Sequence, residues 1–291
     1  MMVLLLTTSI VAATTTTTPA PPNFVIIFGD DWGYGDLGAN WPGTEGLTPN
    51  IDAIAAEGVR FTDFHVASSV CTPSRAGLLT GRLGLRTGVV RNFGPESLGG
   101  LPLNETTLAE MLKTAPTPYR TGMVGKWHLG TYNGFTPVDR GFDSYVGYYG
   151  GGEDYYTHSS GGAFDYHIDE CPNCGENCSR PKWEDMGLYS THLFTARAEK
   201  QIAAHDPKRR LFLYLAYQAV HCPNEVPASY IVPYAHLPEP RRTFAGMLSA
   251  LDEGIANVTA SLKAKGLWEN TILCVCVCSP SFISPSTSSS L

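Results

Sequence analysis

The pattern of apolar positions along the chain predicts buried strands that alternate with amphipathic helices. Short apolar runs at residues 23–29, 211–217 and 272–278 are rich in β-branched and aromatic residues, as strands buried on both faces are. Residues 243–265 carry apolar side chains every three or four positions, which predicts an amphipathic helix that ends at Gly266. This alternation predicts an α/β sandwich with a mostly parallel central sheet flanked by helices.

Three further helices are predicted from their end signals. Residues 47–58 combine a threonine that can cap, a proline suited to the first turn, one apolar face and a terminal glycine. A second helix begins at Thr107, which has capping-box spacing to Glu110. A third covers about 190–204. Residues 145–179 are rich in Gly, Tyr, Ser and Cys without a sustained period, so a loop is predicted there.

Composition and charge narrow the class of protein. The chain has 291 residues, of which 43% are hydrophobic and 16% charged, which is typical of one large globular domain. A net charge of −7 with sparse Lys and Arg argues against a nucleic-acid partner, so an anionic ligand would need a local basic pocket. No run approaches the roughly 20 apolar residues that span a bilayer, so no membrane span is expected.

The first residues are typical of a secretory signal. Residues 1–13 form an apolar run that ends in small residues, and a Thr/Pro spacer extends to residue 22, although a buried strand is the alternative interpretation. The expected location is the secretory pathway, with a lysosomal or extracellular destination. Three N-glycosylation sequons agree with this, at Asn104, Asn177 and Asn257.

Three cysteines lie close together in the predicted loop. Cys171, Cys174 and Cys178 include a Cys-x-x-Cys pair, which is half of a common zinc site, but the second half is missing. A disulfide within this segment is the favoured interpretation for a secreted protein.

Polar side chains that could bind a ligand or take part in catalysis follow the predicted strands. Asp30 and Asp31 come directly after the first strand, where carboxylates commonly bind Ca²⁺ or Mg²⁺, although a solvated turn is the alternative. Lys126 and His128 are two residues apart, and on a strand they would share a face and could clamp an anion. His221 follows another apolar run and could instead be a hydrogen-bonded structural histidine.

Three motifs together carry a resemblance to a known family. The stretches DDWGYGDLG at 30–38, CTPSRAGLLTGR at 71–82 and GKWHLG at 125–130 resemble signatures of the type I sulfatases. The part before about residue 130 resembles the arylsulfatase G branch, and the part after about residue 140 resembles the arylsulfatase B branch, that of N-acetylgalactosamine-4-sulfatase. The resemblance implies an alkaline-phosphatase-like fold, incomplete at the C-terminus, over residues 23–278. The serine-rich segment 279–291 is expected to be a disordered tail.

The resemblance also implies the catalytic residues. Cys71 would be oxidised to formylglycine by the formylglycine-generating enzyme. The hydrated aldehyde carries two hydroxyls, so one can attack sulfur and the other can later expel sulfate. Arg75 would stabilise the negative oxygen, and His128 would take the proton. Cys71 with Pro73 and Arg75 argues against a phosphoryl-transfer relative that uses Ser or Thr.

The same resemblance implies the binding residues and the substrate. Lys126 and His221 would bind the sulfate group, while Asp30, Asp31 and the modified Cys71 would bind Ca²⁺. The implied activity is that of a sulfuric ester hydrolase acting on aryl or glycosaminoglycan sulfates.

One departure from the family pattern bears on the metal. After residue 270 the family continues into Asp-Asn-Gly, whose Asp and Asn complete the metal site, whereas this chain has Cys278 and Ser279 there. Weak or absent calcium binding is therefore expected. The alternative function is a catalytically impaired fragment or pseudo-enzyme that at most binds sulfated glycans.

Overall fold

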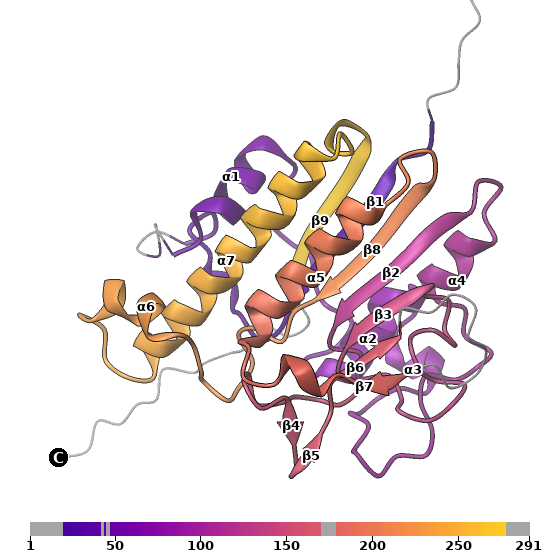
Figure 1. Ribbon diagram of the computed structural model, residues 1–291, viewed down its shortest axis with the longest axis horizontal. Helices are drawn as coiled ribbons and strands as arrows, with labels where there is room; N and C mark the ends of the chain where they lie inside the picture. Colours follow the sequence, from indigo (N-terminus) through magenta and orange to yellow (C-terminus); the bar gives the residue numbers. More distant parts are fainter. Residues whose placement is uncertain (1–19, 42–43, 45–46, 170–178, 278–291) are drawn as a thin grey trace, which may run out of the picture.

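A central sheet organises the chain. The computed structural model describes residues 20–41, 44, 47–169 and 179–277. Seven strands form the sheet in the order β7-β6-β3-β2-β8-β1-β9 (Figure 1). Five neighbouring strands are parallel: β1 (Asn23–Gly29), β2 (Tyr119–Gly125), β3 (Ser144–Gly147), β8 (Arg210–Ala216) and β9 (Thr271–Val277). The antiparallel strands are β6 (His167–Asp169) and β7 (Arg180–Pro181), and β4 (Ser159–Ser160) pairs separately with β5 (Ala163–Phe164).

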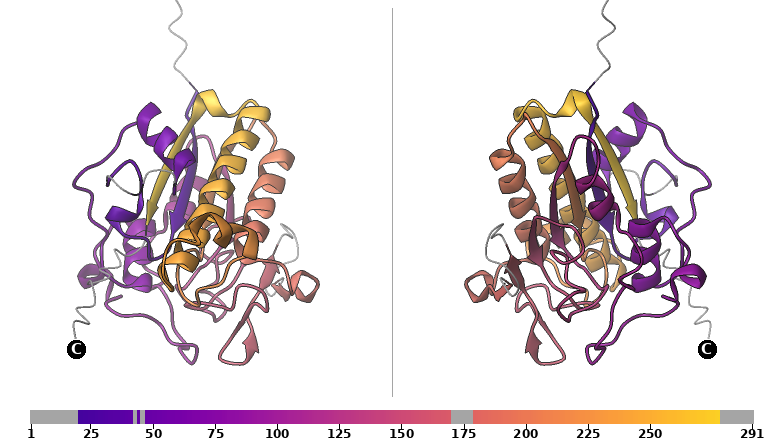
Figure 2. Two further views of the ribbon diagram at one scale, coloured as in Figure 1. Left: turned by 90° about the vertical axis from the view of Figure 1, so that its left-hand side faces the viewer. Right: turned by 90° about the vertical axis from the view of Figure 1, so that its right-hand side faces the viewer.

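Helices cover both faces of this sheet (Figure 2). One face packs against α1 (Pro49–Glu57), α5 (Ser190–Ala204) and α7 (Arg241–Ala264). The other packs against α2 (Cys71–Thr80) and α4 (Leu108–Lys113). The remaining short helices are α3 (Gly84–Thr87), α6 (Ala228–Ile231) and the 3₁₀ turns Tyr34–Asp36, Trp183–Asp185, Val232–Tyr234 and Trp268–Asn270.

The two cores explain why the strands are continuously apolar. Val25 and Ile27 of β1 point to the α1, α5 and α7 side, whereas Phe24 and Phe28 point to the α2 and α4 side. Successive strand residues face opposite sides, so a strand covered on both faces needs apolar residues at every position. The predicted α/β sandwich with a mostly parallel sheet is confirmed.

Most predicted elements are present. The strand at 23–29 and the helix at 190–204 have the predicted bounds, and the strands near 211–217 and 272–278 are shifted by one residue. Thr107 and Glu110 form the predicted capping box, in which the Thr107 hydroxyl accepts from the Glu110 N–H at 3.1 Å. Thr48 occupies the N-cap of α1, but its hydroxyl donates to Asp52 at 3.0 Å instead of capping.

Other predictions need correction. The segment predicted as loop, 145–179, contains most of β3 and all of β6, because these strands are short and depend on pairing with distant residues. Cys171, Cys174 and Cys178 lie outside the described residues, so the disulfide prediction stays open, and so do the boundaries of the leader and the tail. No helix in the described part of the chain is long and apolar enough to cross a membrane.

Candidate active site

The carboxyl ends of three central strands meet at one point. Asp30 directly follows β1, and its N–H donates to the carbonyl of Ala219 beyond β8 at 2.9 Å. Lys126 directly follows β2, and its N–H donates to the carbonyl of Ala216, the last residue of β8, at 2.8 Å. The strand ends of an open parallel sheet are where ligands bind. The fold therefore delivers an acid and a base to this edge.

A fully buried carboxylate lies at the centre of the site. Lys126 Nζ donates to Asp30 Oδ2, and Arg75 Nη2 lies 3.3 Å from the same oxygen. Arg75 Nη1 donates to the Lys126 carbonyl at 2.9 Å, and its guanidinium lies 5.3 Å from the centre of the Phe28 ring. All three charged side chains are 0% exposed, so one anion faces two cations away from water.

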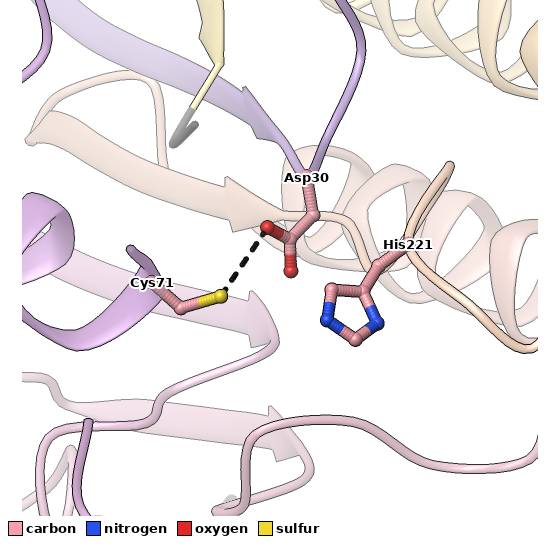
Figure 3. Close-up of side chains that lie close together, drawn as sticks. All are labelled: Asp30, Cys71 and His221. Atoms are coloured by element: carbon pink, nitrogen blue, oxygen red, sulfur yellow. Dashed lines mark hydrogen bonds between the residues drawn. The ribbon is translucent and has the colours of Figure 1, made fainter. Parts of the chain in front are cut away.

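Cys71 completes this arrangement from the start of α2. Its Sγ lies 3.8 Å from Asp30 Oδ1 (Figure 3). The same atom lies 3.3 Å from Lys126 Nζ. It is the first residue of α2, and the next N–H, that of Thr72, donates to Asn92 Oδ1 at 2.9 Å. The free N–H groups at a helix N-terminus favour negative charge. A reactive oxygen at the position of Sγ would therefore be stabilised by the helix and by Lys126.

The rest of the 71–82 motif shapes α2. Pro73 lies in the first turn, where its missing N–H costs nothing. A side chain on Gly77 would lie 2.3 Å from the Cβ of Ala67, so only glycine permits this packing. Gly81 ends the helix with φ +67°, a conformation that glycine adopts without strain. The motif therefore sets both the position of Cys71 and the end of the helix that carries it.

His221 and Asp31 lie on the more open side. Ligand atoms of Asp30, Cys71 and His221 all lie within 4.8 Å of one another (Figure 3). His221 Nε2 lies 3.8 Å from Asp31 Oδ2. Burial alone would lower the pKa of His221, but its contact with Cys71 and the charge of Asp30 raise that pKa above its ordinary value. Burial and the neighbouring Asp30 raise the pKa of Asp31.

His128 occupies a different position from the predicted one. The chain leaves the strand at Gly125, where φ is +101°, so Lys126 and His128 do not share a strand face. His128 has φ +57°, and its Nε2 lies 3.0 Å from the Phe93 carbonyl oxygen. A Cβ added to Gly151 would lie 2.7 Å from His128 Cε1, so the imidazole packs against that backbone. Its Nδ1 is buried without a hydrogen-bond partner among the described residues.

Sequence reasoning missed the segments that surround the motif residues. Residues 88–94 and 97 line a cavity of about 400 Å³, and two of them, Asn92 and Phe93, contact the start of α2 and His128. Gly151 and Gly152 pack against the two histidines. The three consecutive glycines at 150–152 were the one visible signal, because glycine permits close backbone approach.

The side chains of the site supply part of what a hard cation such as Ca²⁺ needs. Asp30 and Asp31 offer carboxylate oxygens, the ligands that Ca²⁺ prefers, and a cation would offset the burial and the charge of Asp30 that together raise the pKa of Asp31. Calcium takes about 6–8 oxygens, however, and the cluster of ligand atoms among the described residues consists of Asp30, Cys71 and His221, without Asp31. Cys278 and Ser279 lie outside the described residues.

We therefore expect weak calcium binding by this chain. Asp30 is already neutralised by Lys126 and Arg75, and two carboxylates supply only part of a calcium shell. Calcium titration of the purified 291-residue chain by calorimetry should show no binding in the micromolar range. A clear micromolar isotherm that is lost in Asp31→Asn would contradict this expectation.

Fold and site together define an α/β protein with a buried, cation-rich centre at the strand ends and a cysteine at a helix N-terminus. Such a centre suits the binding of a tetrahedral anion. The sulfatase family model matches residues 22–276, so the chain belongs to the sulfatase family.

Individual relatives agree with this assignment. The chain is 41% identical over 259 residues to mouse arylsulfatase J, covering 87% of this chain and 41% of the relative. It is 45% identical over 230 residues to human arylsulfatase G, covering 70% of this chain and 42% of the relative. The predicted resemblance to arylsulfatase G is confirmed. The chain thus spans less than half the length of these relatives.

Solved structures give the same fold. The crystal structure of Ps i-CgsB in complex with k-i-k-neocarrahexaose superposes with a TM-score of 0.79 at 31% identity, covering 89% of this chain and 58% of that one. The structure of BT4656 in complex with D-glucosamine-2-N,6-O-disulfate has a TM-score of 0.68 at 19% identity, over 89% of this chain and 65% of that one. The second similarity supports the fold alone.

Proposed function

We propose that the chain is a sulfuric ester hydrolase that cleaves aryl or glycosaminoglycan sulfates, with formylglycine derived from Cys71 and a calcium ion that this chain binds weakly. The observation that carries the proposal is the position of Cys71 Sγ, at a helix N-terminus and 3.3 Å from Lys126 Nζ. Family membership supports it, and so do the names of the relatives. The saccharide bound to Ps i-CgsB favours a sulfated sugar over a simple aryl ester.

The charged residues of the site would each handle part of the reaction. Lys126 lies beside Cys71 and Arg75 lies beside Asp30, where the two cations would bind sulfate oxygens and stabilise negative charge. A formylglycine side chain would supply the oxygen nucleophile, and a cation on Asp30 and Asp31 would add positive charge beside it.

The two histidines would handle protons. The raised pKa of His221 favours its protonated form, which could donate a proton to the departing alcohol oxygen. His128 has a buried Nδ1 without a hydrogen-bond partner among the described residues, so that atom could accept a proton. This assigns an acid and a base to different imidazoles.

The cavity beside the site offers room for the rest of the substrate. It is lined by residues 88–94 and 97, and its wall carries Arg91, Asn92 and Ser97. These side chains can bind hydroxyl or anionic groups, as a sulfated sugar offers. The proposed location is the secretory pathway, either lysosomal or extracellular, where the formylglycine-generating enzyme would be the maturation partner.

A second function follows from the incomplete metal shell. The buried cations could bind a sulfated glycan without turning it over, because Asp30 is the one carboxylate in the described ligand cluster of Asp30, Cys71 and His221. The chain would then be a binding protein of the same family.

One experiment separates these functions. The chain is produced together with the maturation enzyme, and peptide mass spectrometry reports whether residue 71 has become formylglycine. Turnover of a chromogenic aryl sulfate is then compared with Cys71→Ala, for which we expect a loss of about 1,000-fold or more. A chain that is converted at residue 71 but shows the same turnover as Cys71→Ala would contradict the proposed hydrolase activity and favour the binding function.

A further inference from the structure

A buried polar cluster lies behind the two histidines of the site. Glu153 Oε1 accepts from the Ser190 hydroxyl at 3.1 Å and lies 3.3 Å from His158 Nδ1. His158 Nε2 lies 3.2 Å from the Asp185 carbonyl oxygen. The side-chain amide of Gln218 donates to the Glu153 carbonyl. We call Glu153, His158, Ser190 and Gln218 the Glu153 cluster.

The Glu153 cluster has no access to a substrate. Glu153 is 2% exposed, His158 and Ser190 are 0% exposed and Gln218 is 1% exposed. A serine, a histidine and a carboxylate within hydrogen-bond reach could otherwise suggest nucleophilic catalysis. Because no substrate can reach Ser190 Oγ, the cluster can influence chemistry only through the backbone that it holds.

That backbone touches both histidines of the site. A Cβ on Gly151 would lie 2.7 Å from His128 Cε1, and a Cβ on Gly152 would lie 3.3 Å from His221 Cε1. Glu153 follows these two glycines directly. A displacement of the chain at Glu153 would therefore move the surface against which both imidazoles rest.

The cluster also ties this segment to the loop that carries His221. Gln218, three residues before His221, bonds the Glu153 carbonyl. Two residues after Glu153, the Tyr155 hydroxyl donates to the His221 carbonyl at 2.8 Å. Ser190 is the first residue of α5, and both its N–H and its hydroxyl donate to the Tyr155 carbonyl. The glycine segment, the His221 loop and α5 thus meet at Glu153, whose backbone carbonyl bonds Gln218 and whose carboxylate contacts Ser190 and His158.

We propose that Glu153 is a positioning residue that sets the orientation of His128 and His221 by anchoring the backbone of Gly151 and Gly152. The inference rests on the proposed function in so far as the two imidazoles act on a sulfate ester. Buried polar networks that are well satisfied specify one geometry, and displacements of about 1 Å at a site reduce function strongly.

The test reads the two imidazoles directly. The chain contains eight histidines, so it is labelled with ¹³C,¹⁵N-histidine, and the ring signals are assigned with His128→Gln and His221→Gln. Glu153→Ala should shift or broaden both ring signals and weaken the binding of inorganic sulfate by about tenfold. Glu153→Gln should restore both, because its amide can still accept from Ser190 and approach His158.

A matched control removes another buried carboxylate. Asp252, which is 2% exposed and accepts from the Ile51 N–H at 2.8 Å, holds α1 against α7. Asp252→Ala should lower stability and leave both ring signals in place. If Glu153→Ala does not fold, Gln218→Leu serves instead, and we expect it to shift the same two signals.

The outcomes separate this proposal from the proposed function. Unchanged His128 and His221 signals in a folded Glu153→Ala or Gln218→Leu chain would overturn the positioning role. Signals that move as expected support it even if the wild-type chain shows no turnover, which would count against the hydrolase alone. If the wild type is active, kcat of Glu153→Ala should fall by about tenfold, and Glu153→Gln should recover most of it.

Discussion

Replacing Asp30 by Asn will lower the free energy of unfolding by about 3–5 kcal/mol, because it breaks a buried ion pair and leaves its partners in place. Lys126 and Arg75 both face the Asp30 carboxylate, and all three side chains are 0% exposed. Asparagine keeps the shape of the side chain but removes the negative charge that both cations contact. Urea unfolding of variant and wild type in calcium-free buffer measures the loss.

The neighbouring carboxylate is the control for this prediction. The Asp31 side chain is 33% exposed, and burial together with the charge of Asp30 raises its pKa, so its ionised form is disfavoured in the fold. Asparagine tolerates the Asp31 backbone, whose φ is +64°. Asp31→Asn should therefore change stability by less than about 1 kcal/mol. Similar losses in the two variants would show that the buried cations do not depend on Asp30.

Elements with strong local signals could be predicted from the sequence. The run at 23–29 is apolar at every position because β1 is covered on both faces, and this pattern gave its bounds. The helix at 241–264 could be predicted because its apolar residues repeat every three or four positions and pack onto the sheet.

Elements that depend on distant partners could not be predicted in this way. Helix α2 begins at Cys71 without a side-chain cap of its own, and Asn92 satisfies one of its first N–H groups from 20 residues away. The short strands β3 and β6 acquire their conformation by pairing with each other and with β2. Local sequence patterns do not indicate which distant residues will pair with a segment.

The candidate site shows the same division. The motifs identified the residues that meet at the strand ends, and Asp30, Cys71, Lys126 and His221 do lie together. The motif spacing suggested a strand through His128, and this was wrong because the chain turns after Gly125. Glu153 lies outside the three signature motifs, and its importance depends on three segments that only the fold brings together.

The largest effect of pH on the free energy of unfolding should come from Glu153. Burial raises its pKa to about 7, against the opposing hydrogen bond and charge of His158. Burial lowers the pKa of His158, but its hydrogen bond to Glu153 and the charge of that carboxyl raise it above its ordinary value overall. Both groups therefore hold protons more tightly in the folded chain than in the unfolded chain. Their contribution to the stability of the folded chain is therefore largest at low pH and is lost as the pH rises.

We expect the contribution of Glu153 and His158 to the wild-type free energy of unfolding to fall by about 2–3 kcal/mol between about pH 4.5 and pH 8. Other groups titrate in the same range, among them His205, whose pKa burial lowers and whose effect has the opposite sign. The measurement is therefore the difference between wild type and Glu153→Gln in urea unfolding at several pH values. Glutamine does not ionise, so the variant should become relatively more stable as the pH rises. Parallel stability curves would mean that the Glu153 carboxyl does not change its protonation on folding, and would reject the prediction.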